Sequence, residues 1–125
     1  MKKRILFADN EDSIVNNFSL LLEKSGYVVE TAGNGHEAFT KVVKSKESGE
    51  PFDLLITDVK MSVMDGLELL EKLNSKQLKI PTIAITGYRD SYAIRELINT
   101  GCDSYLCKPF ATEKLIGTVK KLIGD

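Results

Sequence analysis

Five residues that can take part in chemistry follow short apolar runs of this 125-residue chain. They are Asp9, Asn10, Asp58, Thr86 and Lys108. Two carboxylates that lie close together repel each other unless a proton or a cation intervenes. Oxygen ligands without Cys or His favour a hard cation such as Mg²⁺, while a lysine and a hydroxyl group suit a bound phosphoryl group. The residue types therefore predict a magnesium and phosphoryl site, provided that the fold brings them together.

Asp58 is the candidate functional centre. It ends the run Leu-Leu-Ile-Thr at 54–57, and the chain turns through Gly66 soon afterwards. An apolar run without alternation suits a strand buried on both faces; periodicity alone does not distinguish it from a buried helix, but the flanking Asp53 and Asp58 favour a strand. A carboxylate at the end of such a strand is held on a rigid element yet faces solvent or a ligand.

The remaining pattern alternates strands with helices. Strands are expected at 4–8, 27–31, 54–57, 80–86 and 103–108, and each is followed by a stretch with helical spacing of apolar residues. Asp12 or Ser13 can cap the first helix, and Ile94, Leu97 and Ile98 are expected on one apolar face of the fourth.

Five strand-helix repeats with short connections predict an α/β fold with a parallel sheet, helices on both faces and right-handed crossovers. A barrel would need eight repeats. The expected strand order is 2-1-3-4-5, that of a flavodoxin-like (βα)5 fold, in one domain over residues 1–125. In this order strands 1 and 3 are neighbours, so Asp9, Asn10 and Asp58 should converge.

Bulk composition excludes several classes. The chain has 17 basic and 18 acidic residues and a formal charge of −1, which does not indicate a nucleic-acid surface or a basic membrane patch. The N-terminal apolar run is too short for a signal peptide or a membrane span, so a cytoplasmic protein is expected. Cys102 and Cys107 fit no zinc or redox spacing and are expected to be reduced, and His36 is expected on a solvated helix face.

Each candidate residue also has an ordinary explanation. Asp, Asn, Thr and Lys commonly cap helices or contact water at strand ends. The simplest explanation of Tyr105 is an aromatic residue half-buried on a strand. Taken together, with every candidate at the same kind of strand end, the set favours one site.

Several segments, in order and with matching spacing, resemble the signature blocks of the receiver domain of two-component response regulators. They read ILFADNE at 5–11, LITD at 55–58, MDG at 64–66, ITG at 85–87 and YLCKPF at 105–110. The resemblance spans the whole chain, and such an ordered set is far more specific than any single block.

The resemblance implies that Asp58 accepts a phosphoryl group from a histidine kinase or a histidine phosphotransfer protein, assisted by Mg²⁺ or Mn²⁺. Asp9, Asn10, Asp58 and the backbone carbonyl of Lys60 match the metal ligands. The chain would be a signalling switch that assists its own phosphorylation and dephosphorylation, rather than an enzyme acting on a separate substrate.

The same resemblance assigns switching roles. Lys108 matches the phosphate-pairing lysine, Thr86 the switch hydroxyl and Tyr105 the switch aromatic, which replaces the simpler explanation of Tyr105. The expected readout surface is formed by helix 4, strand 5 and helix 5, and it would contact a downstream protein or a fused output domain.

The chain also departs from the family pattern. Asn10 stands where a second Asp is usual, which predicts weakened metal affinity. Ser62 replaces a common proline and Gly87 a usual alanine. Lys60 and Tyr88 occupy positions that tune autodephosphorylation, and a bulky Tyr88 predicts a persistent phosphoryl group.

Three alternatives remain at this point. Asn10 motivates a receiver-like interaction module that works without phosphorylation. A flavodoxin-like electron carrier would need a Ser/Thr/Gly-rich phosphate loop after strand 1, which this sequence lacks. A small aspartate-based phosphatase would need a second carboxylate as acid just after its nucleophile, where Lys60 stands.

Overall fold

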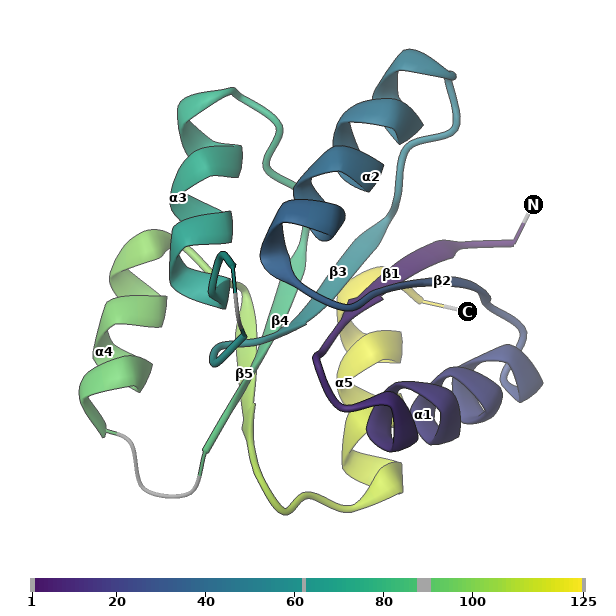
Figure 1. Cartoon of the computed structure of the whole chain (residues 1–125). Coiled ribbons are helices and arrows are strands. Elements are labelled where there is room, and N and C mark those ends of the chain that lie inside the picture. The colour runs from purple at the N-terminus through teal and green to yellow at the C-terminus, as the bar shows by residue number, and fades with distance from the viewer. Residues whose placement is uncertain (1, 62, 88–90, 125) are drawn as a thin grey trace.

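The computed structural model describes residues 2–61, 63–87 and 91–124, and it alternates five strands with five helices (Figure 1). In chain order the elements are β1 (Arg4–Ala8), α1 (Asp12–Lys24), β2 (Val28–Ala32), α2 (Gly35–Glu47), β3 (Leu54–Asp58), α3 (Gly66–Ser75), β4 (Thr82–Thr86), α4 (Ser91–Thr100), β5 (Ser104–Cys107) and α5 (Thr112–Ile123).

The strands form one parallel sheet in the order β2-β1-β3-β4-β5, as the sequence predicts. Ala8 of β1 pairs with Thr57 of β3, and the next residue along the chain is an aspartate in both cases, Asp9 just after β1 and Asp58 at the end of β3. Because all strands run the same way, their carboxyl ends meet at one edge of the sheet.

Two apolar layers hold the sheet between the helices. Helices α2, α3 and α4 cover one face, while α1 and α5 cover the other (Figure 1). Alternate residues of the central strands supply the two layers, so that Leu6 and Leu55 face the first group and Ile5, Phe7 and Ile56 the second. A strand buried on both faces needs apolar residues without alternation, which explains the run before Asp58.

Two details of the helices differ from expectation. Neither Asp12 nor Ser13 caps α1: Glu11 is its N-cap residue, and no side chain makes the cap hydrogen bond. On α4, Leu97 is buried but Ile98 is 59% exposed, so these two residues do not share a buried face. Consecutive residues on a helix point about 100° apart, and a narrow contact with the sheet buries only one of them. The side chain of Ile94 lies outside the described residues.

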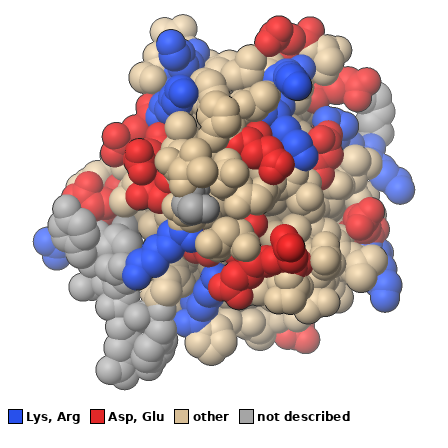
Figure 2. Space-filling view, viewed as in Figure 1, with Lys and Arg blue, Asp and Glu red and all other residues tan. Residues whose placement is uncertain are grey.

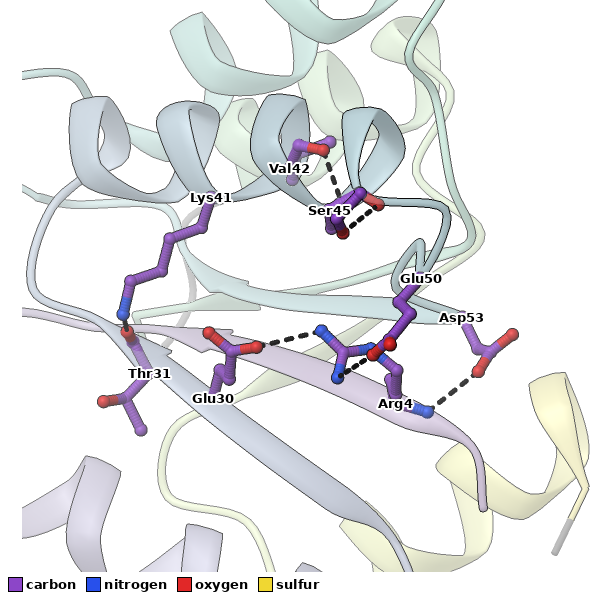
Figure 3. A network of polar contacts seen from close by, with 9 residues as sticks. Arg4, Glu30, Thr31, Lys41, Val42, Ser45, Glu50 and Asp53 are labelled. Atoms are coloured by element: carbon purple, nitrogen blue, oxygen red, sulfur yellow. Dashed lines mark hydrogen bonds and ion pairs between the residues drawn. The ribbon is translucent and has the colours of Figure 1, made fainter. Parts of the chain in front are cut away.

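At the opposite edge of the sheet, Arg4 ties β2 and the chain before β3 to β1 (Figure 3). Its guanidinium donates to Glu30 at 2.9 Å, lies 3.7 Å from Glu50 and stacks 5.0 Å from the ring centre of Phe52. Its backbone N–H donates to Asp53 at 2.8 Å. This polar cluster lies where the strands begin, away from the carboxyl edge, and stabilises the α2–β3 connection.

Acidic and basic side chains are interspersed over the face shown in Figure 2. None of the helices in the described part of the chain combines the length and the apolar character that a membrane span requires.

Candidate functional site

The carboxyl edge of the sheet brings the predicted residues together. Asp58 is the last residue of β3 and Thr86 the last of β4, while Asp9 directly follows β1 and Lys108 directly follows β5. Asp9, Asp58 and Thr86 are 0%, 5% and 1% exposed, so the carboxylates are far less accessible than a solvent-facing strand end suggests. The backbone N–H of Lys108 donates to the Thr86 carbonyl at 2.9 Å, which joins the ends of β4 and β5.

The ammonium group of Lys108 lies among three carboxylates. Its Nζ atom donates to Oδ2 of Asp58 at 3.1 Å and lies 3.7 Å from both Oδ2 of Asp9 and Oε1 of Glu11. Partial burial lowers the pKa of Lys108. The hydrogen bond to Asp58 and the negative charges of Asp58, Asp9 and Glu11 outweigh this effect, so the pKa of Lys108 is raised above its usual value. Lys108 therefore stays charged at neutral pH.

Asp9 is a buried carboxylate with an incomplete set of partners. Its Oδ1 accepts from the backbone N–H of Glu11 at 3.0 Å, but its buried Oδ2 has no hydrogen-bond partner. Desolvation raises the pKa of Asp9, the charge of Asp58 adds to this rise, and the Glu11 hydrogen bond and Lys108 oppose it. The folded protein holds a negative charge here that one lysine does not fully compensate.

The loop after β3 is fixed by backbone contacts. The N–H of Lys60 donates to Oδ1 of Asp58 at 3.3 Å, and the N–H of Gly66 donates to the Val59 carbonyl at 2.8 Å. Asp65 then begins α3 with a capping box that pairs it with Glu68. Both oxygens of Asp58 thus have donors, and the carboxylate is oriented before any ligand binds.

Two glycines permit this loop geometry. A Cβ on Gly66 would lie 2.5 Å from the Asp58 carbonyl oxygen, and one on Gly35 would lie 2.2 Å from the Met64 carbonyl oxygen. The N–H of Gly35 also donates to that same Met64 carbonyl at 3.0 Å. The start of α2 therefore packs directly on the loop that carries Lys60.

The donors at this edge fit a hard divalent cation. Four groups here are oxygen donors: Oδ2 of Asp9, which has no hydrogen-bond partner, the Asp58 carboxylate, the amide oxygen of Asn10 and the Lys60 carbonyl. No group of three or more His, Cys, Asp or Glu side chains arranged to hold a metal occurs among the described residues. Mg²⁺ usually keeps several of its waters and therefore needs few ligands from a protein.

The remaining predicted residues differ in their exposure. Asn10 and the Lys60 side chain are exposed, and Tyr105 on β5 is 40% exposed. His36 is exposed as expected, and Cys102 and Cys107 are free thiols. The predictions for Ser62 and Tyr88 concern positions outside the described residues.

Sequence reasoning missed two contributors. Neither Glu11 nor Gly35 is assigned a role at the site from the sequence alone. No signal in the sequence indicates Glu11, because its N-cap position is known only from the structure and the expected caps were Asp12 and Ser13. Nothing in the sequence indicates the contact of Gly35 with Met64, because those residues lie 29 positions apart.

Replacing Asp9 with asparagine is expected to raise the free energy of unfolding by about 1–2 kcal/mol at pH 7, because the buried charge disappears while the Glu11 N–H keeps an acceptor. Folding raises the pKa of Asp9 above its ordinary 3.8, so the folded protein holds the proton of this carboxyl more tightly than the unfolded chain does. The resulting contribution to stability is present in acid and is lost as the pH rises from 3.8 through the raised value. The advantage of the variant should therefore shrink as pH falls through that window. Urea denaturation at several pH values measures this change in stability.

The exposed control Asp12→Asn should change the free energy of unfolding by less than about 0.5 kcal/mol. An equal gain in both variants would contradict the explanation.

A family model described as "Response regulator receiver domain" matches residues 5–120. The chain is 34% identical to the alkaline phosphatase synthesis transcriptional regulatory protein PhoP of Bacillus subtilis, over 98% of this chain and 49% of PhoP. It is 37% identical to the probable transcriptional regulator ycf29 of Porphyra purpurea, over 98% of this chain and 57% of ycf29. The chain thus spans about half the length of these curated relatives.

Solved structures show the same arrangement of elements. A CheY-like response regulator receiver domain protein from Methanospirillum hungatei superposes with a TM-score of 0.85 at 32% identity, over 97% of this chain and 93% of that chain. The chemotaxis protein CheY4 of Vibrio cholerae superposes with a TM-score of 0.86 at 31% identity, over 98% and 99% of the two chains.

Proposed function

Since this chain belongs to the receiver domains of two-component response regulators, we propose that Asp58 is its phosphoacceptor and that residues 1–125 act as one phosphorylation switch. Response regulators exchange signals with histidine kinases and output domains. The observation that carries the proposal is the Asp58 carboxylate itself, which ends a rigid buried strand and is held by Lys60 N–H at one oxygen and Lys108 at the other.

In the proposed reaction, a carboxylate oxygen of Asp58 attacks the phosphorus of a phosphohistidine. The bond from phosphorus to the donor nitrogen breaks, and a mixed anhydride forms on Asp58. Mg²⁺ is typical of the family and, when bound, neutralises charge on the phosphoryl oxygens. Asp9, Asn10, Asp58 and the Lys60 carbonyl would hold it, as the oxygen donors at this edge suggest.

The ammonium group of Lys108 would change its partner when the phosphoryl group is transferred. Before transfer it pairs with Asp58, and afterwards its ammonium group can pair with a phosphoryl oxygen, since Nζ already lies 3.1 Å from the carboxylate. The transferred group replaces one negative charge by nearly two and adds acceptor oxygens. Lys108 is thereby a phosphate-binding residue rather than an acid or base, because its raised pKa keeps it protonated.

The proposed switch runs from Thr86 to Tyr105. Thr86 ends β4 beside Asp58, and its hydroxyl would donate to the phosphoryl group. Tyr105 is 40% exposed in this conformation and would change its burial as Thr86 moves. The surface of α4, β5 and α5 would then present the signal to a downstream protein or a fused output domain.

A second candidate function is an interaction module that works without phosphorylation. The observation in its favour is Asn10, which removes one negative charge from the expected metal ligands. Both candidates share the fold and differ in whether Asp58 reacts.

Incubation with acetyl phosphate and Mg²⁺, followed by mass spectrometry of the intact protein, separates the two candidates. The phosphorylation switch predicts a mass increase of one phosphoryl group, with much less incorporation when EDTA removes the cation. Beryllofluoride with Mg²⁺ should also shift the NMR signals of residues near Thr86 and Tyr105. Absence of both responses would contradict the switch and support the module.

A further inference from the structure

We propose that Glu11 supplies the negative charge that Asn10 does not bring to the cation site. This inference rests on the proposed function, because it concerns the same cation. It adds a residue that the expected ligand set of Asp9, Asn10, Asp58 and the Lys60 carbonyl does not contain.

The Glu11 carboxylate points toward Lys108 rather than back onto its own helix. Glu11 is the N-cap residue of α1, with φ −101° and ψ 104°, and its side chain makes no cap hydrogen bond. An N-cap side chain normally turns back to accept from the first turn of its helix. The Glu11 carboxylate instead lies 3.7 Å from Lys108 Nζ, at the mouth of the site.

A backbone hydrogen bond holds Glu11 beside Asp9. Its N–H donates to Oδ1 of Asp9 at 3.0 Å, so the turn between β1 and α1 holds Glu11 next to the buried carboxylate. Asn10 lies between them in the chain and is exposed and uncharged. Two carboxylates, Asp9 and Glu11, therefore flank the neutral residue and face the same lysine.

The carboxylates around Lys108 outnumber its single positive charge. Asp9, Glu11 and Asp58 surround one ammonium group, and the buried Oδ2 of Asp9 has no hydrogen-bond partner. These carboxylates leave negative charge that an incoming divalent cation can neutralise. The side chain of Glu11 is 57% exposed, so it can turn from Lys108 toward the water ligands of a cation without disturbing the core.

The sharpest test is a double-mutant cycle of Glu11→Gln and Asn10→Asp, with Mg²⁺ titrations followed by ¹H–¹⁵N NMR shifts. With Asn10 present, Glu11→Gln should raise the Mg²⁺ dissociation constant about five- to tenfold, as expected for one charge a few ångströms from a divalent ion. In the Asn10→Asp background, the same change should cost less than about twofold, because the missing charge is already supplied.

A matched control is Glu47→Gln, which makes the same charge change in the last turn of α2, at the opposite edge of the sheet. It should alter Mg²⁺ affinity by less than about 1.5-fold, because salt screens exposed charges at that distance. Circular dichroism establishes that every variant is folded.

Two results would overturn the inference while leaving the proposed function intact. One is a Glu11→Gln effect no larger than that of Glu47→Gln, in a protein that still takes up a phosphoryl group with Mg²⁺. The other is an equal loss of affinity in the wild-type and Asn10→Asp backgrounds, which would make Glu11 a general contributor rather than a replacement. If neither the wild type nor Asn10→Asp binds Mg²⁺, and neither is phosphorylated, the inference and the proposed function are overturned together.

Discussion

Replacing Asp58 with asparagine is expected to abolish phosphoryl incorporation from acetyl phosphate, because an amide oxygen does not form a mixed anhydride under these conditions. The fold should persist, since asparagine has nearly the same volume and can still accept from the Lys60 N–H. The expected loss is complete, whereas a change in a residue that only positions the phosphoryl group slows its transfer. Mass spectrometry of the intact protein and phosphate-affinity electrophoresis measure it.

Asp12→Asn is the control for this experiment. Asp12 is an exposed carboxylate in the first turn of α1, three positions after Asp9. Its replacement removes one negative charge, as in Asp58→Asn, but at an exposed position. It should be phosphorylated like the wild type. Incorporation that persists in Asp58→Asn, or that is lost equally in both variants, would place the reactive group elsewhere.

The largest expected effect on stability comes from Gly35. An alanine there would bring its Cβ to 2.2 Å from the Met64 carbonyl oxygen and 2.8 Å from the carbonyl carbon, so backbone must move. Overpacking of this kind typically costs about 2–3 kcal/mol. The displaced loop also carries Lys60, so Mg²⁺ affinity should fall together with stability. Urea denaturation and Mg²⁺ titration measure the two effects.

Gly33→Ala is a close control, two residues earlier in the same turn. Its added Cβ would meet only Oε1 of Glu37 at 3.8 Å, an ordinary contact. Alanine also restricts the unfolded chain, so this variant should be neutral or more stable by up to about 1 kcal/mol. Equal stabilities of the two variants would show that the contact between Gly35 and Met64 relaxes without cost.

The order of elements and the position of Asp58 could be predicted because both depend on local patterns. The apolar run before Asp58 has no alternation, and only a strand covered on both faces buries all of it. Repeated strand-helix units leave few sheet orders, and the parallel order places Asp9 beside Asp58. The same reasoning was wrong for the cap of α1 and for Ile98 on α4, because each depends on which neighbour lies nearby in space.

The sequence by itself determined the α/β class, the strand order and the set of residues at the carboxyl edge. Hydrophobic periodicity and the ends of strands are local features, so they can be recognised from neighbouring residues in the sequence. Only the tertiary structure decided how those residues share charge. One lysine faces three carboxylates, of which Glu11 comes from a helix cap and Asp9 is fully buried. Burial and distance set electrostatic energies, and both arise when separate strands pack side by side.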